Sequence, residues 1–162
     1  MRRTEDAGAI RVDSPKTILH NRMKSTKPEA ELDEIPEWEC LEILDHHSLG
    51  RIGVVVNGRP LIFPVNYAMS GRIVVFRTGA GTILAHAPEA RVAFEVDGYD
   101  ESPGAGWSVM VQGIARDATD SFDDVSWAAR AAAPWPLAPG AKPFRLAIEP
   151  DQITGRRFQI RR

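Results

Sequence analysis

The sequence has a single cysteine, no long apolar run and almost no imbalance of charge. Cys40 cannot form an intramolecular disulfide, and one thiol cannot by itself build a zinc or iron–sulfur site. No apolar run approaches the roughly 20 residues that a membrane helix needs, and no hydrophobic signal segment follows Met1. These absences predict a soluble protein that stays in a reducing cytoplasm and does not enter a membrane.

Charge and histidine content disfavour three further classes of function. With 20 basic and 22 acidic residues the formal net charge is −2, so there is no excess of Lys and Arg to bind a nucleic-acid backbone. Adjacent residues on a helix point about 100° apart, so His46 and His47 suit a cap at a helix C-terminus better than two ligands of one ion. No H-E-x-x-H, cysteine pair or G-x-S-x-G elbow occurs. We therefore predict no metal site, no nucleic-acid partner and no serine-hydrolase triad.

The 162 residues suit one domain preceded by a polar arm. Residues 1–32 carry mixed charge, two prolines and few apolar residues, a composition typical of a flexible arm. Residues 33–162 form the domain. Within it, apolar residues at helical spacing and short Ala-rich runs predict helices that end near His46 and that cover residues 82–87 and 122–133.

Six runs rich in β-branched and aromatic residues predict six strands. They are residues 51–56, 61–67, 72–77, 91–96, 107–115 and 144–150. Asn57-Gly58 and Ser70-Gly71 accept the positive φ angles of tight turns, so the first strands are expected to form an antiparallel meander. Six strands bridged by short helices predict a mainly β fold, namely a closed or nearly closed antiparallel barrel.

The segment 76–82 has the residues needed to bind a phosphate. A strand ends there in Arg77 and Thr78, and the chain passes through two glycines to Thr82 at the start of a helix. A guanidinium, two hydroxyls and free backbone N–H groups are therefore available to an anion. The alternative is a plain glycine-rich turn with Arg77 in solvent.

Two of the strands also have residues suited to a ligand. Pro64 and Asn66 interrupt an otherwise apolar strand, which indicates a bulge, an edge or a face turned to a ligand. In the fifth strand Trp107 alternates with Ser108, and Gln112 shares the face of Ser108, so one face is apolar and the other offers a hydroxyl and an amide. A structural bulge and an ordinary barrel strand are the alternatives.

Taken in order, these segments resemble the flavin-binding split-barrel family of pyridoxamine 5'-phosphate oxidase, and more closely its branch of nitroimidazole-resistance-type reductases. The matching stretches are LGRIG (49–53), FPVNY (63–67), VFRTGAGT (75–82), VAFEVD (92–97), GWSVMVQG (106–113) and ITGRRF (153–158). The resemblance covers about Trp38 to Phe158. It implies a six-stranded antiparallel split β-barrel that pairs as a homodimer and binds FMN.

The resemblance also implies a cofactor site of nine residues. These are Pro64, Val65, Asn66, Arg77, Thr78, Thr82, Trp107, Ser108 and Gln112. In the family the first three lie along the flavin ring, the next three hold its phosphate, and the last three come from the other subunit. The implied activity is an oxidoreductase whose flavin passes hydride or electrons to a small planar substrate. Neither the substrate, the electron donor nor a catalytic residue is identified by the sequence.

One departure from the family pattern concerns the phosphate. Relatives usually carry a lysine directly after the Gly-Thr pair, and this chain has Ile83 there, so Arg77 is the only cation of the turn. The loss of one charged contact costs roughly 1.5–3 kcal/mol. The sequence therefore leaves three alternatives: FMN bound more weakly, a deazaflavin coenzyme of the F-420 type, or a non-enzymatic protein that binds haem or another hydrophobic ligand.

Overall fold

The computed structural model describes residues 29–101, 104–120, 123–132, 134 and 140–161. The strands in this part of the chain are β1 (Glu29–Ile35), β2 (Leu49–Val56), β3 (Arg59–Ser70), β4 (Ile73–Thr78), β5 (Arg91–Asp100), β6 (Ala105–Asp117) and β7 (Phe144–Arg161). The helices are α1 (Glu37–His46), α2 (Thr82–His86) and α3 (Asp124–Ala131). The prediction of a mainly β fold with short flanking helices is confirmed.

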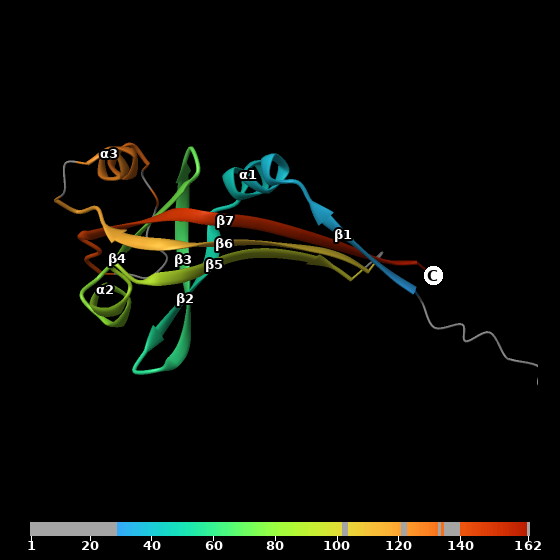
Figure 1. The fold of residues 1–162 in the computed structure, drawn as a ribbon, viewed down its shortest axis with the longest axis horizontal. Helices are drawn as coiled ribbons and strands as arrows, with labels where there is room; N and C mark the ends of the chain where they lie inside the picture. The colour runs from blue at the N-terminus through green and yellow to red at the C-terminus, as the bar shows by residue number, and fades with distance from the viewer. Residues whose placement is uncertain (1–28, 102–103, 121–122, 133, 135–139, 162) are drawn as a thin grey trace, which may run out of the picture.

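All strands pair antiparallel in one sheet whose order is β1-β7-β4-β3-β2-β5-β6. Because β7 also pairs with β6, the hydrogen bonding runs in a ring through the six predicted strands. β7 has 18 residues, so its first part can pair with β4 while its last part pairs with β1. Figure 1 shows β5, β6 and β7 running side by side along the molecule, with the β2–β3 hairpin standing across them. This arrangement confirms the split barrel.

β1 is a strand that the sequence did not predict. It begins at Glu29, inside the segment assigned to the arm, and pairs with residues 155–161 of β7. Four of its seven residues are acidic, and Asp33 and Glu34 lie opposite Arg157 and Arg156. Opposite charges on paired strands stabilise the pairing, although they leave no pattern of hydrophobic alternation to detect. The rest of the predicted arm, residues 1–28, lies outside the described residues.

The barrel core consists of the inward-facing side chains of the strands together with one face of α1. Burial alternates along β5 and β6, as the two-residue period of a strand requires. Phe76 and Phe94 are among the largest fully buried side chains, and Leu44 of α1 is buried with them. The Tyr67 hydroxyl donates a hydrogen bond to the Leu44 carbonyl at 2.6 Å. Burial raises the pKa of Tyr67, so this hydroxyl stays protonated and keeps α1 tied to β3.

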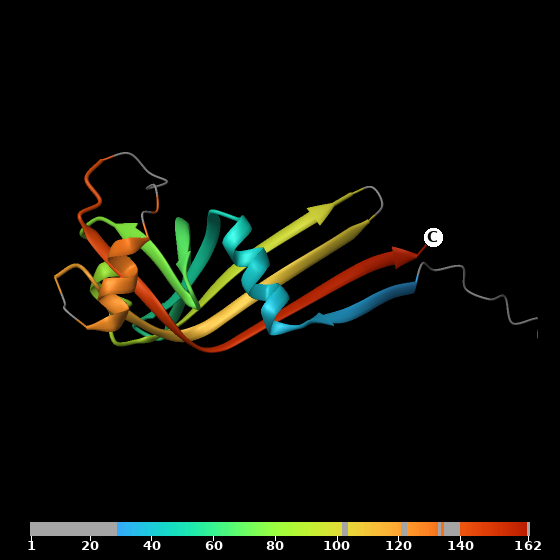
Figure 2. The same ribbon diagram turned by 90° about the horizontal axis from the view of Figure 1, so that it is seen from above.

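α1 lies across one face of the long strands, and β1 runs beside the end of β7 (Figure 2). The two histidines at the end of α1 bind its last carbonyls, as predicted. The Nδ1 atom of His46 lies 2.7 Å from the Glu42 carbonyl, and that of His47 lies 2.7 Å from the Ile43 carbonyl. Among the described residues no helix is long and apolar enough to cross a membrane.

Candidate functional site

A small pocket lies where β4 ends and α2 begins. β4 ends at Thr78, three residues follow, and α2 starts at Thr82. The pocket has a volume of about 180 Å³. Its lining residues are Phe63, Thr78, Gly79, Ala80, Gly81, Thr82, Ile83 and Lys142. The structure therefore brings two of the residues predicted to hold a phosphate, Thr78 and Thr82, into one pocket with a cation from a distant segment.

That cation, Lys142, was not predicted from the sequence. It precedes β7, and its side chain lies along Gly79, where a Cβ atom would be 3.6 Å from the lysine Nζ and 3.8 Å from its Cδ. The backbone of Lys142 is held by Arg77, whose Nε donates a hydrogen bond to the Lys142 carbonyl at 2.9 Å. The pocket lining contains no Asp or Glu. An ammonium and two hydroxyls without a competing carboxylate suit an anion.

Arg77 itself does not belong to the pocket lining. Side chains alternate along a strand, so Arg77 leaves β4 on the face opposite to that of Thr78. It is half-buried there and lies directly opposite Arg145 of β7. Two guanidinium groups at opposed positions repel each other, and together they make the region beside the pocket more positive. Arg77 therefore contributes charge and anchors Lys142, while the pocket wall is formed by other residues.

The strand predicted to lie along a flavin ring passes this pocket. Phe63 lines the pocket, and Pro64 and Asn66 follow on β3 with their side chains on the outer face of the barrel. Val65 points inward and is only 6% exposed, so its backbone is what it can offer to a ligand. Pro64 lies opposite Arg51 of β2. Phe63 shares the inner face with Val65, so a ligand on the outer face of β3 would meet the side chains of Pro64 and Asn66 but only the backbone of Phe63 and Val65.

The three residues predicted on β6 do not share one face. Ser108 and Gln112 point to the outer face, where they lie opposite Asp97 and Ala93 of β5. Trp107 points to the other face, and its ring packs edge-on against the ring of His47 with 4.9 Å between centroids. One ligand molecule on the outer face can therefore reach the side chains of Ser108 and Gln112 but not that of Trp107.

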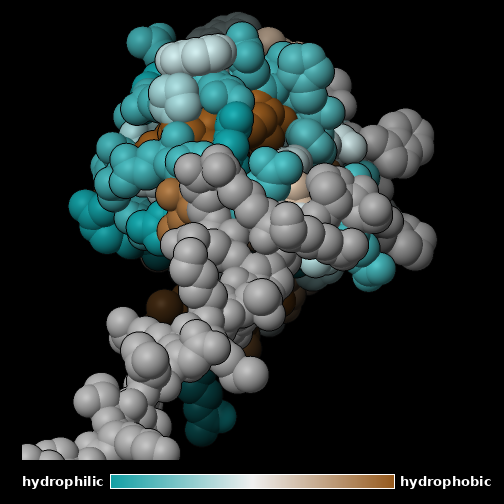
Figure 3. Space-filling model, turned by 90° about the vertical axis from the view of Figure 1, so that its right-hand side faces the viewer, coloured by the Kyte–Doolittle hydropathy of each residue, from teal (hydrophilic) through white to brown (hydrophobic). Residues whose placement is uncertain are grey.

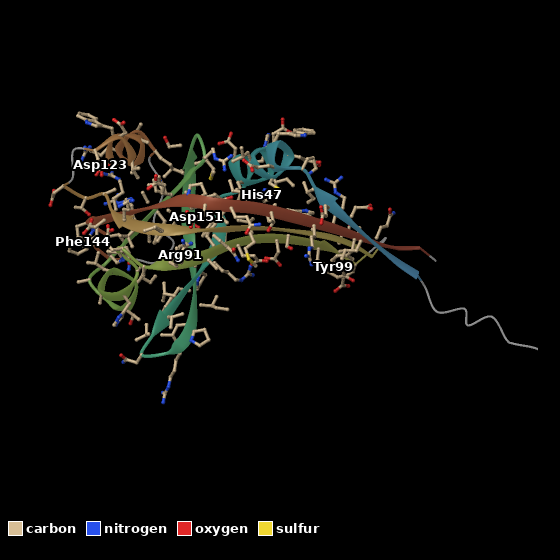
Figure 4. The ribbon with its side chains drawn as sticks, viewed as in Figure 1. His47, Arg91, Tyr99, Asp123, Phe144 and Asp151 are labelled. Carbon is tan, nitrogen blue, oxygen red and sulfur yellow. The ribbon has the colours of Figure 1, made fainter. Side chains whose placement is uncertain are left out.

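Trp107 belongs to a second, larger pocket of about 660 Å³ between α1 and the extended strands. Its lining residues are Asp33, Glu39, Ile43, His47, Gly98, Tyr99, Asp100, Ala105, Gly106, Trp107, Arg157, Phe158 and Gln159. Three are acidic and one is basic, so this pocket suits a neutral or cationic ligand better than a phosphate. In Figure 4, Tyr99 of the larger pocket lies towards one end of the molecule. Phe144, which is close to Lys142 in the chain, lies at the other end.

Comparison with known proteins identifies the family. A family model described as pyridoxamine 5'-phosphate oxidase matches residues 36–157, which is most of the chain. The chain belongs to the pyridoxamine 5'-phosphate oxidase family.

Several relatives within this family are similar over most of their length. An uncharacterized protein of Mycobacterium tuberculosis is 31% identical over 144 residues, covering 85% of this chain and 93% of the relative. An FAD-binding protein of Mycobacterium smegmatis is 32% identical with a TM-score of 0.61, covering 80% of this chain and all of that one. A candidate pyridoxamine 5'-phosphate oxidase of Corynebacterium glutamicum is 30% identical with a TM-score of 0.67, covering 84% and 97%. A candidate 5-nitroimidazole antibiotic resistance protein of Bacteroides thetaiotaomicron, 13% identical with a TM-score of 0.57, shares the fold over 82% of this chain and 90% of that one.

The residues of the small pocket have the chemistry that a phosphate group requires. Lys142 supplies positive charge, Thr78 and Thr82 supply hydroxyl groups, and no carboxylate of the lining would repel a phosphate. The departure at position 83 is visible in the structure, because Ile83 lines the pocket and also packs against the barrel core. The pocket therefore contains one lysine, Lys142, while position 83 is an isoleucine.

The outer face beside Pro64 carries a small charge cluster that the sequence analysis did not single out. Arg51 forms ion pairs with Glu95, at 3.5 Å, and with Asp97. All three residues alternate with buried ones along β2 and β5, which is the signal that could have placed them together. Burial and the neighbouring Asp97 carboxylate raise the pKa of Glu95, although Arg51 opposes the shift.

The raised pKa of Glu95 predicts a pH dependence of stability. A carboxyl whose pKa in the folded protein exceeds its ordinary value of 4.5 stabilises the fold below that pH, and this contribution is lost as pH rises through the raised pKa. Relative to Glu95→Gln, the parent should therefore lose stability as pH rises from below 4.5 through the raised pKa. The effect should be small, because the group is partly exposed and screened by salt. Urea unfolding of both proteins across this range measures it, and a difference that stays constant with pH would contradict it.

Proposed function

We propose that the protein is a flavin-dependent oxidoreductase that passes hydride or electrons between a bound flavin and a small planar substrate. FMN is the cofactor we favour. FAD carries the same first phosphate, and the FAD-binding relative of Mycobacterium smegmatis supports it as an alternative. The observation that carries the proposal is the composition of the small pocket: Thr78, Thr82 and Lys142 line it without a carboxylate, and Phe63 of β3, the strand that contains Pro64 and Asn66, lines it too.

Each part of the site has a task in this proposal. A bound flavin would supply the redox chemistry, and the protein would bind and orient it. Lys142, Thr78 and Thr82 hold the phosphate by charge and hydrogen bonds. The backbone of β3 around Val65 and the amide of Asn66 would be available to bind the edge of the flavin ring. Arg51 lies opposite Pro64 and is paired with Glu95 and Asp97, so this cluster would offer polar groups beside the ring without net positive charge.

The site is proposed to be completed by a second copy of the chain. The outer face of the sheet is unusually apolar for a solvent surface, with Ile62 69% exposed, Val55 61% and Met110 39%. A groove of about 440 Å³ on this face includes Val55, Ile62 and Gln112. Pairing two such faces would bury the apolar side chains and bring Ser108 and Gln112 of one subunit towards β3 of the other. Apolar residues also show between hydrophilic ones at the end of the molecule seen in Figure 3.

One preparation tests both the cofactor and the dimer. The protein purified from its native host should elute as a dimer whose peak carries flavin absorbance, with close to one flavin per subunit, and mass spectrometry of the released molecule should give FMN. Release of FAD would mean that the cofactor is FAD, bound through the same first phosphate. Release of a deazaflavin coenzyme would replace FMN in the proposal. A flavin-loaded monomer would refute the shared site, and a protein that neither contains flavin nor gains it on titration would refute the whole proposal.

A second candidate function is the storage or transfer of haem or another hydrophobic ligand in the larger pocket. It is favoured by His47, whose Nδ1 contacts the Ile43 carbonyl and whose Nε2 is left as the nitrogen that could bind iron. It ranks second because Asp33, Glu39 and Asp100 line the same pocket and would repel haem propionates. A haem absorbance band that is lost in His47→Ala would favour it over the flavin proposal.

A further inference from the structure

The family's usual source of positive charge at the flavin phosphate is missing from this chain. The position after the Gly-Thr pair is Ile83, and this side chain packs against the barrel core and also lines the pocket. The five-residue helix α2 is too short to supply much charge through its dipole. If the pocket binds a phosphate, another cation has to neutralise it.

Lys142 is the cation placed to do so. Lys142 lies 59 positions after Ile83 in the chain, yet both residues line the same pocket. It is the only lysine after Lys27 in the sequence. Its ammonium lies beside Gly79 at the centre of the turn, and in the described residues it forms no ion pair with a carboxylate. A lysine is a compact point charge on a flexible stem and binds phosphate well in that form.

The anchoring of Lys142 adds a second argument. The hydrogen bond from Arg77 Nε to the Lys142 carbonyl joins residues that are 65 positions apart and fixes the lysine backbone to the end of β4. Arg77 and its strand partner Arg145 also keep the surroundings positive. The region around the pocket is therefore positively charged before any anion binds.

We infer that Lys142 is the phosphate-binding cation of this protein, in place of the lysine that relatives carry at the position of Ile83, and that it makes the site selective for phosphorylated flavins over riboflavin. The inference rests on the proposed function. It assigns Arg77 the role of a positioning residue, which acts by holding Lys142.

The test compares FMN with riboflavin, which has the same ring and no phosphate. Fluorescence quenching gives the affinity of each for the parent, Lys142→Met and, as a matched control, Arg59→Met, which removes an exposed cation on the β2–β3 hairpin. Lys142→Met should weaken FMN binding by about 10-fold to 100-fold and leave riboflavin binding unchanged. Arg59→Met should change neither.

A rescue variant distinguishes the loss of the Lys142 charge from damage to the fold caused by the substitution. Adding Ile83→Lys to Lys142→Met restores a cation at the position that relatives use, so FMN affinity should return most of the way to that of the parent. Unfolding midpoints confirm that each variant is folded. Equal FMN affinity of the parent and Lys142→Met, or an equal loss for riboflavin, would overturn the role of Lys142 while leaving the flavin proposal standing. A parent that binds neither FMN nor riboflavin would overturn both.

Discussion

Replacement of Gly113 by alanine is expected to lower the free energy of unfolding by about 3 kcal/mol or more. At Gly113 a Cβ atom would lie 2.1 Å from the Glu149 carbonyl oxygen and 2.9 Å from the Cα of Pro150. Both are backbone atoms of β7, so no side-chain rotation can relieve the clash. The register between β6 and β7 shifts at this point, and the two strands can approach so closely only because Gly113 has no side chain.

Urea unfolding of the two proteins measures the effect, and Gly53→Ala is the matched control. Gly53 also lies in a barrel strand, but a Cβ there would be 3.7 Å from its nearest neighbour, the Ala93 carbonyl oxygen, which is an ordinary contact. Its free energy of unfolding should change by about 0.5 kcal/mol or less. Similar midpoints for parent and Gly113→Ala would mean that β7 can move away from β6, and that the ring is less rigid than the register implies.

The barrel was predictable from the sequence because each of its six main strands can be recognised from its own residue pattern. β-Branched and aromatic residues occupy most of the inward positions of β2, β5 and β6 at a spacing of two. The turn residues Asn57 and Gly58 have φ values of 51° and 74°, which suit Asn and Gly. β1 was missed because its pairing depends on charge complementarity with the basic end of β7. The hydrophobic pattern of a single segment cannot reveal a partner that lies more than 100 residues later.

The candidate site was predictable only in part, for a similar reason. Thr78 and Thr82 belong to one local motif, and their position in a shared pocket follows from a single turn. Lys142 reaches that pocket through tertiary structure, from a segment of proline, glycine and alanine that has no regular pattern. Trp107 was grouped with Ser108 by motif, although the alternation of the strand already places them on opposite faces. Local sequence motifs identify residues with suitable chemistry, whereas the tertiary fold determines which of these residues lie in the same site.

Replacement of Arg77 by alanine is expected to weaken FMN binding by about 10-fold to 100-fold, as much as the loss of Lys142 itself. The reason is indirect. Arg77 does not line the pocket, but without its Nε the Lys142 carbonyl loses its hydrogen bond and the lysine is free to leave Gly79. Riboflavin, which has no phosphate to lose, should bind Arg77→Ala as it binds the parent. Fluorescence titrations with both flavins measure this, and Arg145→Ala tests whether positive charge beside the pocket is sufficient to explain the loss.

A double-mutant cycle decides how Arg77 acts. If Arg77 holds Lys142 in place, the two residues work as a unit, so Arg77→Ala should cost little further FMN affinity once Lys142 is already methionine. If the Arg77 guanidinium instead bound the phosphate directly, the two free-energy losses would add. Each single variant would then bind FMN at least about 10-fold more weakly than the parent, and the double variant at least about 100-fold more weakly than the parent. Arg77→Lys sharpens the distinction, because lysine keeps the charge and lacks the guanidinium Nε that bonds to the Lys142 carbonyl. We expect Arg77→Lys to bind FMN nearly as poorly as Arg77→Ala, and full affinity in this variant would show that Arg77 contributes its charge and not its hydrogen bond.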